Sequence, residues 1–206
     1  MKLLYIDAGI TGPGAASRQI SAAIVENLVR ANPRLEVIRR DLDAEPIPHL
    51  DSRNVAALGA TDGDALEGEA ARAAGIVQEF LDADVVVLGA PMYNLGIPSL
   101  LKAWFDRILV AGKTFRYTAA GVEGIAGDKT VIIASARGGL YAPGTPQAAF
   151  DFHEPYLRGL FGFIGVKDVT VVRAEGLNIS PELRESALKA ALASAAQVRG
   201  APALAA

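Results

Sequence analysis

The chain of 206 residues contains no cysteine and only two histidines. The lack of cysteine excludes disulfides, thiolate metal sites and cysteine nucleophiles. His49 and His153 lie far apart, and neither has the spacing of a metal-binding motif, so we expect no metal site and no zinc hydrolase. No apolar run approaches the ~18 residues that a membrane-spanning helix needs, so we expect no membrane segment.

An excess of positive charge is also absent, because the formal net charge is -3 and no basic stripe stands out. This balance argues against a nucleic-acid surface. The first residues reach Asp7 without a long apolar region, which is not typical of a secretory signal. With 51% hydrophobic residues, the chain is expected to be one cytoplasmic domain over residues 1–206, with a frayed tail from residue 200.

Five short apolar segments alternate with segments of helical periodicity. We expect strands at 2–6, 35–39, 85–88, 129–135 and 169–172. Helices are expected after Ser17, over 69–82, from Ser99, within 146–163 and from Pro181, with Ser17 and Ser180 as N-caps and with Gly200–Pro202 ending the last one. Right-handed crossovers turn this alternation into an α/β fold with a doubly wound parallel sheet and helices on both faces.

Two segments stand outside this alternation. Residues 41–68 form a long polar connection with prolines, a length that is usually functional or mobile. Residues 112–127 suggest an extended excursion from the sheet, because polar and aromatic side chains alternate over 114–117. Together they suggest a covered pocket and a dimer.

Three turns are expected to meet where the strands end, since parallel strands present their carboxyl ends at one edge. Gly9–Ser17 is rich in glycine and leads into a helix, which is a layout that binds phosphate. Pro91–Leu95 offers the flat ring of Tyr93 and the amide of Asn94, and 136–139 offers closely approaching glycine backbone. A phosphate at one end and a flat ring at the other describe flavin mononucleotide (FMN). A dinucleotide fits less well, because Gly-x-Gly-x-x-Gly is missing and Asp41 is discounted as a ribose ligand.

Each of these features has a structural alternative. Tyr93 and Trp104 can be core aromatics, and for Trp104 we expect this. Asn94 can simply tolerate a left-handed turn. Arg137 can pair with a surface acid, Tyr117 can be an exposed tip residue, and the first loop can be a plain connector.

Four blocks carry a family resemblance that spans essentially the whole chain. They are Ala-Pro-Met-Tyr-Asn at 90–94, Thr-Phe-Arg-Tyr-Thr at 114–118, Ser-Ala-Arg-Gly-Gly at 135–139 and Gly-Phe-Ile-Gly at 162–165. In these blocks the chain resembles the FMN-dependent NADH azoreductases, which also reduce quinones and have a flavodoxin-like fold. The resemblance implies tightly but non-covalently bound FMN, and a homodimer with its active sites at the interface.

The resemblance also assigns roles to residues. It places the flavin phosphate at the first loop, the ring and ribityl chain at the second turn, the pyrimidine side of the ring at the third, and the substrate beside two aromatic residues. The residues at the phosphate are Gly9, Ala15, Ala16 and Ser17, and those at the ring and ribityl chain are Pro91, Met92, Tyr93, Asn94 and Leu95. Those at the pyrimidine side are Ala136, Arg137, Gly138 and Gly139, and the two aromatic residues beside the substrate are Tyr117 and Phe163. No side chain is expected to be catalytic, because the flavin carries the chemistry.

The chain departs from the family pattern in its phosphate loop. Gly9, Ala15 and Ala16 stand where the family has serine hydroxyls, and Ala136 also replaces a serine. Each lost neutral hydrogen bond costs about 0.5–1.5 kcal/mol. We therefore expect FMN to bind more weakly than in relatives that keep these hydroxyls.

The predicted function is hydride transfer from NADH or NADPH to quinones and azo compounds by a ping-pong mechanism. The alternative is a flavodoxin-like electron carrier without its own substrate. The choice between NADH and NADPH stays open, since Arg53 and Arg116 can each reach a 2′-phosphate or not. The physiological acceptor also stays open.

Overall fold

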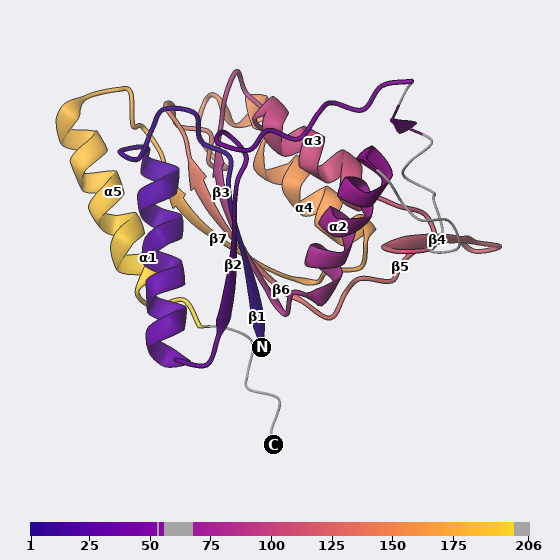
Figure 1. Cartoon of the computed structure of the whole chain (residues 1–206). Helices are drawn as coiled ribbons and strands as arrows, with labels where there is room; N and C mark the ends of the chain where they lie inside the picture. The colour runs from indigo at the N-terminus through magenta and orange to yellow at the C-terminus, as the bar shows by residue number, and fades with distance from the viewer. Residues whose placement is uncertain (53, 56–67, 200–206) are drawn as a thin grey trace.

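The structure is a computed structural model in which residues 1–52, 54–55 and 68–199 are described. Five parallel strands form one sheet in the order β2-β1-β3-β6-β7 (Figure 1). Their bounds are Lys2–Asp7 for β1, Glu36–Asp41 for β2, Val85–Pro91 for β3, Thr130–Ala136 for β6 and Asp168–Ala174 for β7. The predicted five-stranded parallel sheet is confirmed.

Helices cover both faces of the sheet, as predicted. Figure 1 shows α1 and α5 together on one side and α2, α3 and α4 on the other. Their bounds are Ala16–Ala31 for α1, Glu69–Asp82 for α2, Ser99–Ile108 for α3, Glu154–Phe163 for α4 and Pro181–Ala195 for α5, with a short 3-10 helix η2 at Ala148–Phe150. No helix in the described ranges is long and apolar enough to cross a membrane.

Burial on both faces explains the uninterrupted apolar runs of the central strands. All residues of β3 and β6 are buried, as expected for strands in a sheet that helices cover on each side. Trp104 of α3 is fully buried and meets Phe80 and Phe105 edge-on, with ring centroids 5.8 and 5.0 Å apart. It is therefore a core aromatic.

Two predicted helix ends are wrong. Ser17 is not the N-cap of α1, because the helix begins at Ala16 after a turn in which the Ala15 N–H bonds to the Gly12 carbonyl. The last helix ends at Ala195, before Gly200. Turns follow it, and the Asn27 side chain donates to the Val198 carbonyl there at 2.7 Å. Ser180 does cap α5, accepting from the Leu183 N–H. The predicted frayed tail and residues 53 and 56–67 of the 41–68 loop lie outside the described residues.

The excursion at 112–127 is a hairpin of strands β4 (Phe115–Thr118) and β5 (Gly121–Gly124). It docks against the end of α4 through glycine backbone. A Cβ atom at Gly124 would lie only 2.1 Å from the Gly165 nitrogen, and Gly165 itself has a φ of 95°. Glycine is required here because backbone meets backbone.

We predict that Gly124→Ala destabilises the protein by about 1–3 kcal/mol, since the new methyl group forces the hairpin away from α4. Gly159→Ala is the control, because its Cβ inside α4 meets nothing within 4 Å. That change should stabilise the helix by about 0.5–1 kcal/mol. Urea unfolding of both variants measures the difference, and a Gly124→Ala protein as stable as wild type would refute the tight docking.

Candidate functional site

A cleft of about 380 Å³ opens at the carboxyl ends of β1, β3 and β6. Its volume is within the range of small-molecule sites. It is lined by the first loop through Ala15, Ala16 and Ser17, by the second through Pro91, Met92 and Tyr93, and by the third through Ala136, Arg137 and Gly138. The structure thus brings the three predicted turns to one place. Gly9, Asn94, Leu95 and Gly139 lie in the same turns without lining the cleft.

Hydrogen bonds tie the three turns to one another. The Tyr93 hydroxyl accepts from the backbone N–H of Ile10 at 3.1 Å, which joins the second turn to the first. The Met92 N–H donates to the Ala136 carbonyl at 2.8 Å, which joins the second turn to the third. Tyr93 therefore places its ring at the cleft while its hydroxyl holds the first loop.

The start of α1 leaves polar groups unused at one end of the cleft. The N–H groups of Ala16, Ser17 and Arg18 are in the first turn, where a helix offers no acceptor. The Ser17 side chain is 1% exposed, and its Oγ has no hydrogen-bond partner in the described structure. Free N–H groups, a helix dipole and an idle buried hydroxyl together suit an anion such as phosphate.

The second turn, which contributes Pro91, Met92 and Tyr93 to the cleft, is built from tight backbone. Tyr93 and Gly96 exchange both backbone hydrogen bonds, and the two residues between them, Asn94 and Leu95, have φ of 48° and 73°. Such a turn suits asparagine, whereas leucine is strained there. The Asn94 side chain is exposed, so its amide is open to a ligand at the rim.

The third turn is joined to the segment after β7. Arg137 N–H donates to the Ala174 carbonyl, and the carbonyls of Arg137 and Gly138 accept from the N–H groups of Leu177 and Asn178, all within 2.9–3.1 Å. Within the described chain, the N–H groups of Gly138 and Gly139 have no such partner. They remain available to an electron-rich ring edge.

Arg18 holds the first loop from behind. Its guanidinium donates to the Gly9 carbonyl, with Nη2 at 2.7 Å, and to both oxygens of Asp41 at 2.6 and 2.7 Å. Its Nη1 is also 3.4 Å from buried Asp7. The hydrogen bond from Arg18 lowers the pKa of Asp41 to about 2. This carboxylate is therefore charged and already paired with Arg18, which agrees with discounting it as a ribose ligand.

Arg137 lines the cleft with its backbone, but its side chain is fully buried among acids. Nη1 lies 3.1 Å from both Asp151 and Glu175, and Nη2 lies 2.5 Å from Glu154. Burial opposes the charge of Glu154, but hydrogen bonding from Arg173 and the Arg137 charge outweigh it and lower the pKa of Glu154. Arg137 thus anchors the third turn, and of its three acids Glu154 is buried while Asp151 and Glu175 are partly buried.

Tyr117 and Phe163 lie together but do not line the cleft. Both pack on Phe115, with ring centroids 5.6 and 4.8 Å away, and they are 75% and 42% exposed. The hairpin that carries Tyr117 lies on the far side of the molecule from α1 and α5 (Figure 1). Within one chain these two aromatic residues form no wall of this cleft.

Five lining residues were not singled out from the sequence: Thr11, Gly14, Leu177, Asn178 and Arg184. Thr11 and Gly14 belong to the predicted first loop. The other three follow β7, the fifth strand of the parallel sheet. Because ligands bind at the carboxyl ends of parallel strands, the position of these residues after β7 was the signal that could have identified them.

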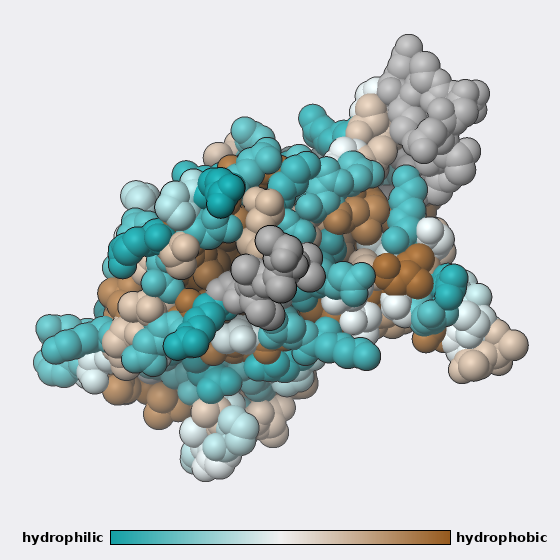
Figure 2. Space-filling model, turned by 90° about the horizontal axis from the view of Figure 1, so that it is seen from below, coloured by the Kyte–Doolittle hydropathy of each residue, from teal (hydrophilic) through white to brown (hydrophobic). Residues whose placement is uncertain are grey.

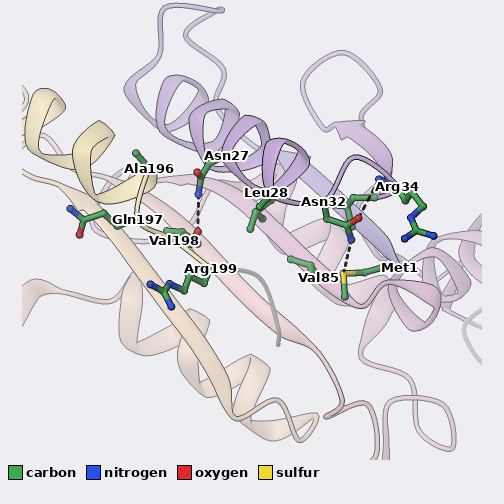
Figure 3. A pocket seen from close by; sticks show the side chains of 12 residues that line it. Met1, Asn27, Leu28, Asn32, Arg34, Val85, Ala196, Gln197, Val198 and Arg199 are labelled. Carbon is green, nitrogen blue, oxygen red and sulfur yellow. Dashed lines mark hydrogen bonds between the residues drawn. The ribbon is translucent and has the colours of Figure 1, made fainter. Parts of the chain in front are cut away.

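A larger hollow, of about 1140 Å³, lies at the opposite, amino end of the strands. Figure 3 shows that two of its amide side chains are hydrogen-bonded, Asn27 to Val198 and Asn32 to Met1. Figure 2, which views this end, shows mainly hydrophilic side chains with smaller apolar patches. Because no buried polar atom among the residues that line it lacks a partner, we do not take it as the functional site.

The chain matches the family described as having a flavodoxin-like fold over residues 1–198. It is 55% identical over 193 residues to an FMN-dependent NADH:quinone oxidoreductase of Xanthomonas oryzae pv. oryzae (strain MAFF 311018), covering 94% of each chain. It is 52% identical over 202 residues to FMN-dependent NADH:quinone oxidoreductase 2 of Bradyrhizobium diazoefficiens, covering 98% of this chain and 100% of that one.

Solved structures agree with this. The chain superposes on an azoreductase from Bacillus anthracis str. Sterne with a TM-score of 0.85 and 33% identity, covering 96% of this chain and 97% of that one. An FMN-dependent NADH-azoreductase from Bacillus anthracis str. Ames Ancestor, solved in complex with FMN, gives a TM-score of 0.82 at 25% identity, covering 96% and 99%.

His153, buried next to the Arg137 cluster, should make stability acid-sensitive. Burial and then the Arg137 charge lower its pKa to about 4, whereas the unfolded imidazole titrates near ~6.5. As pH falls below that value, only the unfolded state takes up the proton, so the free energy of unfolding should drop by about 2 kcal/mol between pH 7.5 and 5.0.

Urea unfolding at these two pH values measures the drop, and His153→Gln should abolish most of it. The carboxylates contribute little in this range, because they titrate near ~4 when unfolded. An equal pH dependence in wild type and variant would show that His153 is not its source.

Proposed function

Because the chain belongs to the flavodoxin-like family of FMN-dependent NADH:quinone oxidoreductases, we propose that its cleft holds FMN and that it reduces quinones and azo compounds with NADH. The chain is thus an FMN-dependent oxidoreductase. Its relatives, named as enzymes with their own acceptors, favour this function over an electron carrier without a substrate.

The unused donors at both ends of the cleft carry this proposal. The buried Ser17 hydroxyl and the free N–H groups of the first α1 turn fit a phosphate. The N–H groups of Gly138 and Gly139 fit the pyrimidine edge of the ring, with the Asn94 amide at its rim. Met92 and Tyr93 lie between these two ends, where the ribityl chain and the ring would run.

Bound FMN supplies the redox chemistry, accepting a hydride from NADH and passing two electrons to the acceptor. The protein holds and orients the ring and directs backbone dipoles at the edge where negative charge develops. No acid or base has to be recruited from the chain. NADH and the flat acceptor then occupy the same place in turn, which corresponds to ping-pong kinetics.

The nucleotide we propose is NADH, in agreement with the names of the relatives. Arg116, one candidate for a 2′-phosphate, is paired across the hairpin with Glu123 at 2.8 Å. Arg53, the other, lies outside the described residues. A cytoplasmic location is proposed with this, because NADH is a cytoplasmic metabolite.

Purified protein tests the function directly. We expect FMN to copurify or to be taken up, and NADH to be consumed with menadione or methyl red with parallel-line kinetics. Asn94→Ala should retain less FMN, since the rim loses its amide. A protein that stays colourless and inert with added FMN would contradict the proposal, and intersecting kinetic lines would contradict the ping-pong order.

We also propose that the enzyme is a homodimer whose active sites lie at the interface. Large apolar side chains are exposed along the hairpin and around α4, including Tyr117, Phe150, Phe152 and Phe163 at 75%, 51%, 59% and 42%. Such a surface marks an interaction site. Because Tyr117 and Phe163 do not line the cleft of their own chain, they would shape a substrate pocket only beside the cleft of a second copy.

Light scattering of the purified holoprotein should give twice the chain mass. Phe152→Glu should weaken the dimer by roughly 30-fold, the equivalent of about 2 kcal/mol for a central apolar residue, and should lower quinone reduction. Val37→Glu on β2 is the control, a 38% exposed apolar residue away from this surface, and should leave the mass unchanged. A fully active wild-type monomer would contradict the shared site.

A further inference from the structure

The phosphate end of the cleft has donors but little free positive charge. A flavin phosphate carries a charge near −2 at neutral pH, and the loop contributes only one buried hydroxyl, Ser17. Gly9, Ala15 and Ala16 provide no side-chain donor. Charge-assisted hydrogen bonds are about twice as strong as neutral ones, so a single cation can offset several missing hydroxyls.

The two arginines buried behind the loops do not provide that charge. Arg18 is shared between Asp41, Asp7 and the Gly9 carbonyl. Arg137 is surrounded by three carboxylates. Each guanidinium is paired with its own acids.

Arg184 is different. It lies in the first turns of α5, which runs beside α1 (Figure 1), and it lines the same cleft as Ala15, Ala16 and Ser17. The one hydrogen bond of its side chain in the described structure is long, 3.4 Å from Nη1 to the Leu177 carbonyl, and no described carboxylate pairs with it. The side chain is half-buried and uncommitted, so it can swing towards an anion at the start of α1.

We propose that Arg184 provides the counter-charge for the FMN phosphate, in place of the hydroxyls that this loop lacks. This inference rests on the proposed function and adds a specificity residue to it. The phosphate would lie between the first turn of α1, the Ser17 hydroxyl and the Arg184 guanidinium. Selection of FMN over riboflavin, which lacks the phosphate, would then depend on α5 as well as on the loop.

Flavin binding tests this without any assay of activity. Apoprotein is titrated with FMN and, separately, with riboflavin, and binding is followed by quenching of flavin fluorescence. Arg184→Gln should weaken FMN roughly 10- to 100-fold, the range expected for a hydrogen bond to a charged group. Riboflavin affinity should not change. Arg184→Lys should recover part of the FMN affinity, and the salt dependence of FMN binding should be shallower in Arg184→Gln than in wild type.

Lys189→Gln is the matched control, because it removes the same charge from an exposed position of the same helix. It should leave both affinities unchanged. An unchanged FMN affinity in Arg184→Gln would overturn the inference. An equal loss of FMN and riboflavin affinity would overturn it too, because it would mean that Arg184 only supports local structure. In either case the proposed function survives if wild type binds FMN and reduces quinones. A wild-type protein that binds neither flavin would overturn both.

Discussion

Strand β3 is hydrogen-bonded on both of its edges, and this pairing places every part of the cleft. On one edge its Gly89 pairs with Asp7 at the end of β1, and on the other its Pro91 pairs with Ala136 at the end of β6. The turns after these strands therefore start within two strand spacings of one another. A one-residue slip would reverse which side chains face each core, so the two cores hold the register that the site needs.

Charge is used in two different ways around this register. Arg18 and Arg137 are each surrounded by carboxylates behind a loop, and removing one partner of such a buried pair is costly because the remaining charge is stranded. These arginines give the loops a fixed shape without offering charge to a ligand. The groups left for a ligand are backbone N–H groups, the buried Ser17 hydroxyl, which has no partner in the described structure, and Arg184. Rigid shape and free donors thus come from different residues.

The sequence predicted the order of elements well, because continuous apolar runs and 3.6-residue periodicity are strong local signals. It set the carboxyl ends of the strands too early. Gly89, Ala90 and Pro91 have little strand propensity, yet they continue β3, since the ladder with β6 holds them in line. Ser17 is a good N-cap by composition, but the Gly12–Ala15 turn starts the helix one residue before it.

The candidate site was predictable where residues adjacent in sequence form it, as at 91–93 and 136–138. It was not predictable where tertiary packing decides. Nothing local distinguishes Arg137, which is buried among Asp151, Glu154 and Glu175, from Arg184, which has no acid partner in the described structure. A surface salt bridge and a buried cluster look alike in a sequence. Arg184 lies on a helix far along the chain, and only the side-by-side packing of α1 and α5 brings it to the cleft.

A loop hydroxyl and an arginine on a neighbouring helix place different limits on the sequence of the first loop. A hydroxyl of the loop can act only where the backbone already points it, whereas a long arginine on a neighbouring helix can reach the same anion from several rotamers. The first loop of this chain could therefore lose side-chain donors at Gly9, Ala15 and Ala16 and still keep its backbone donors, since Arg18 holds the Gly9 carbonyl. The phosphate is then held less by short, neutral hydrogen bonds and more by the longer-range attraction of a charge, which salt screens.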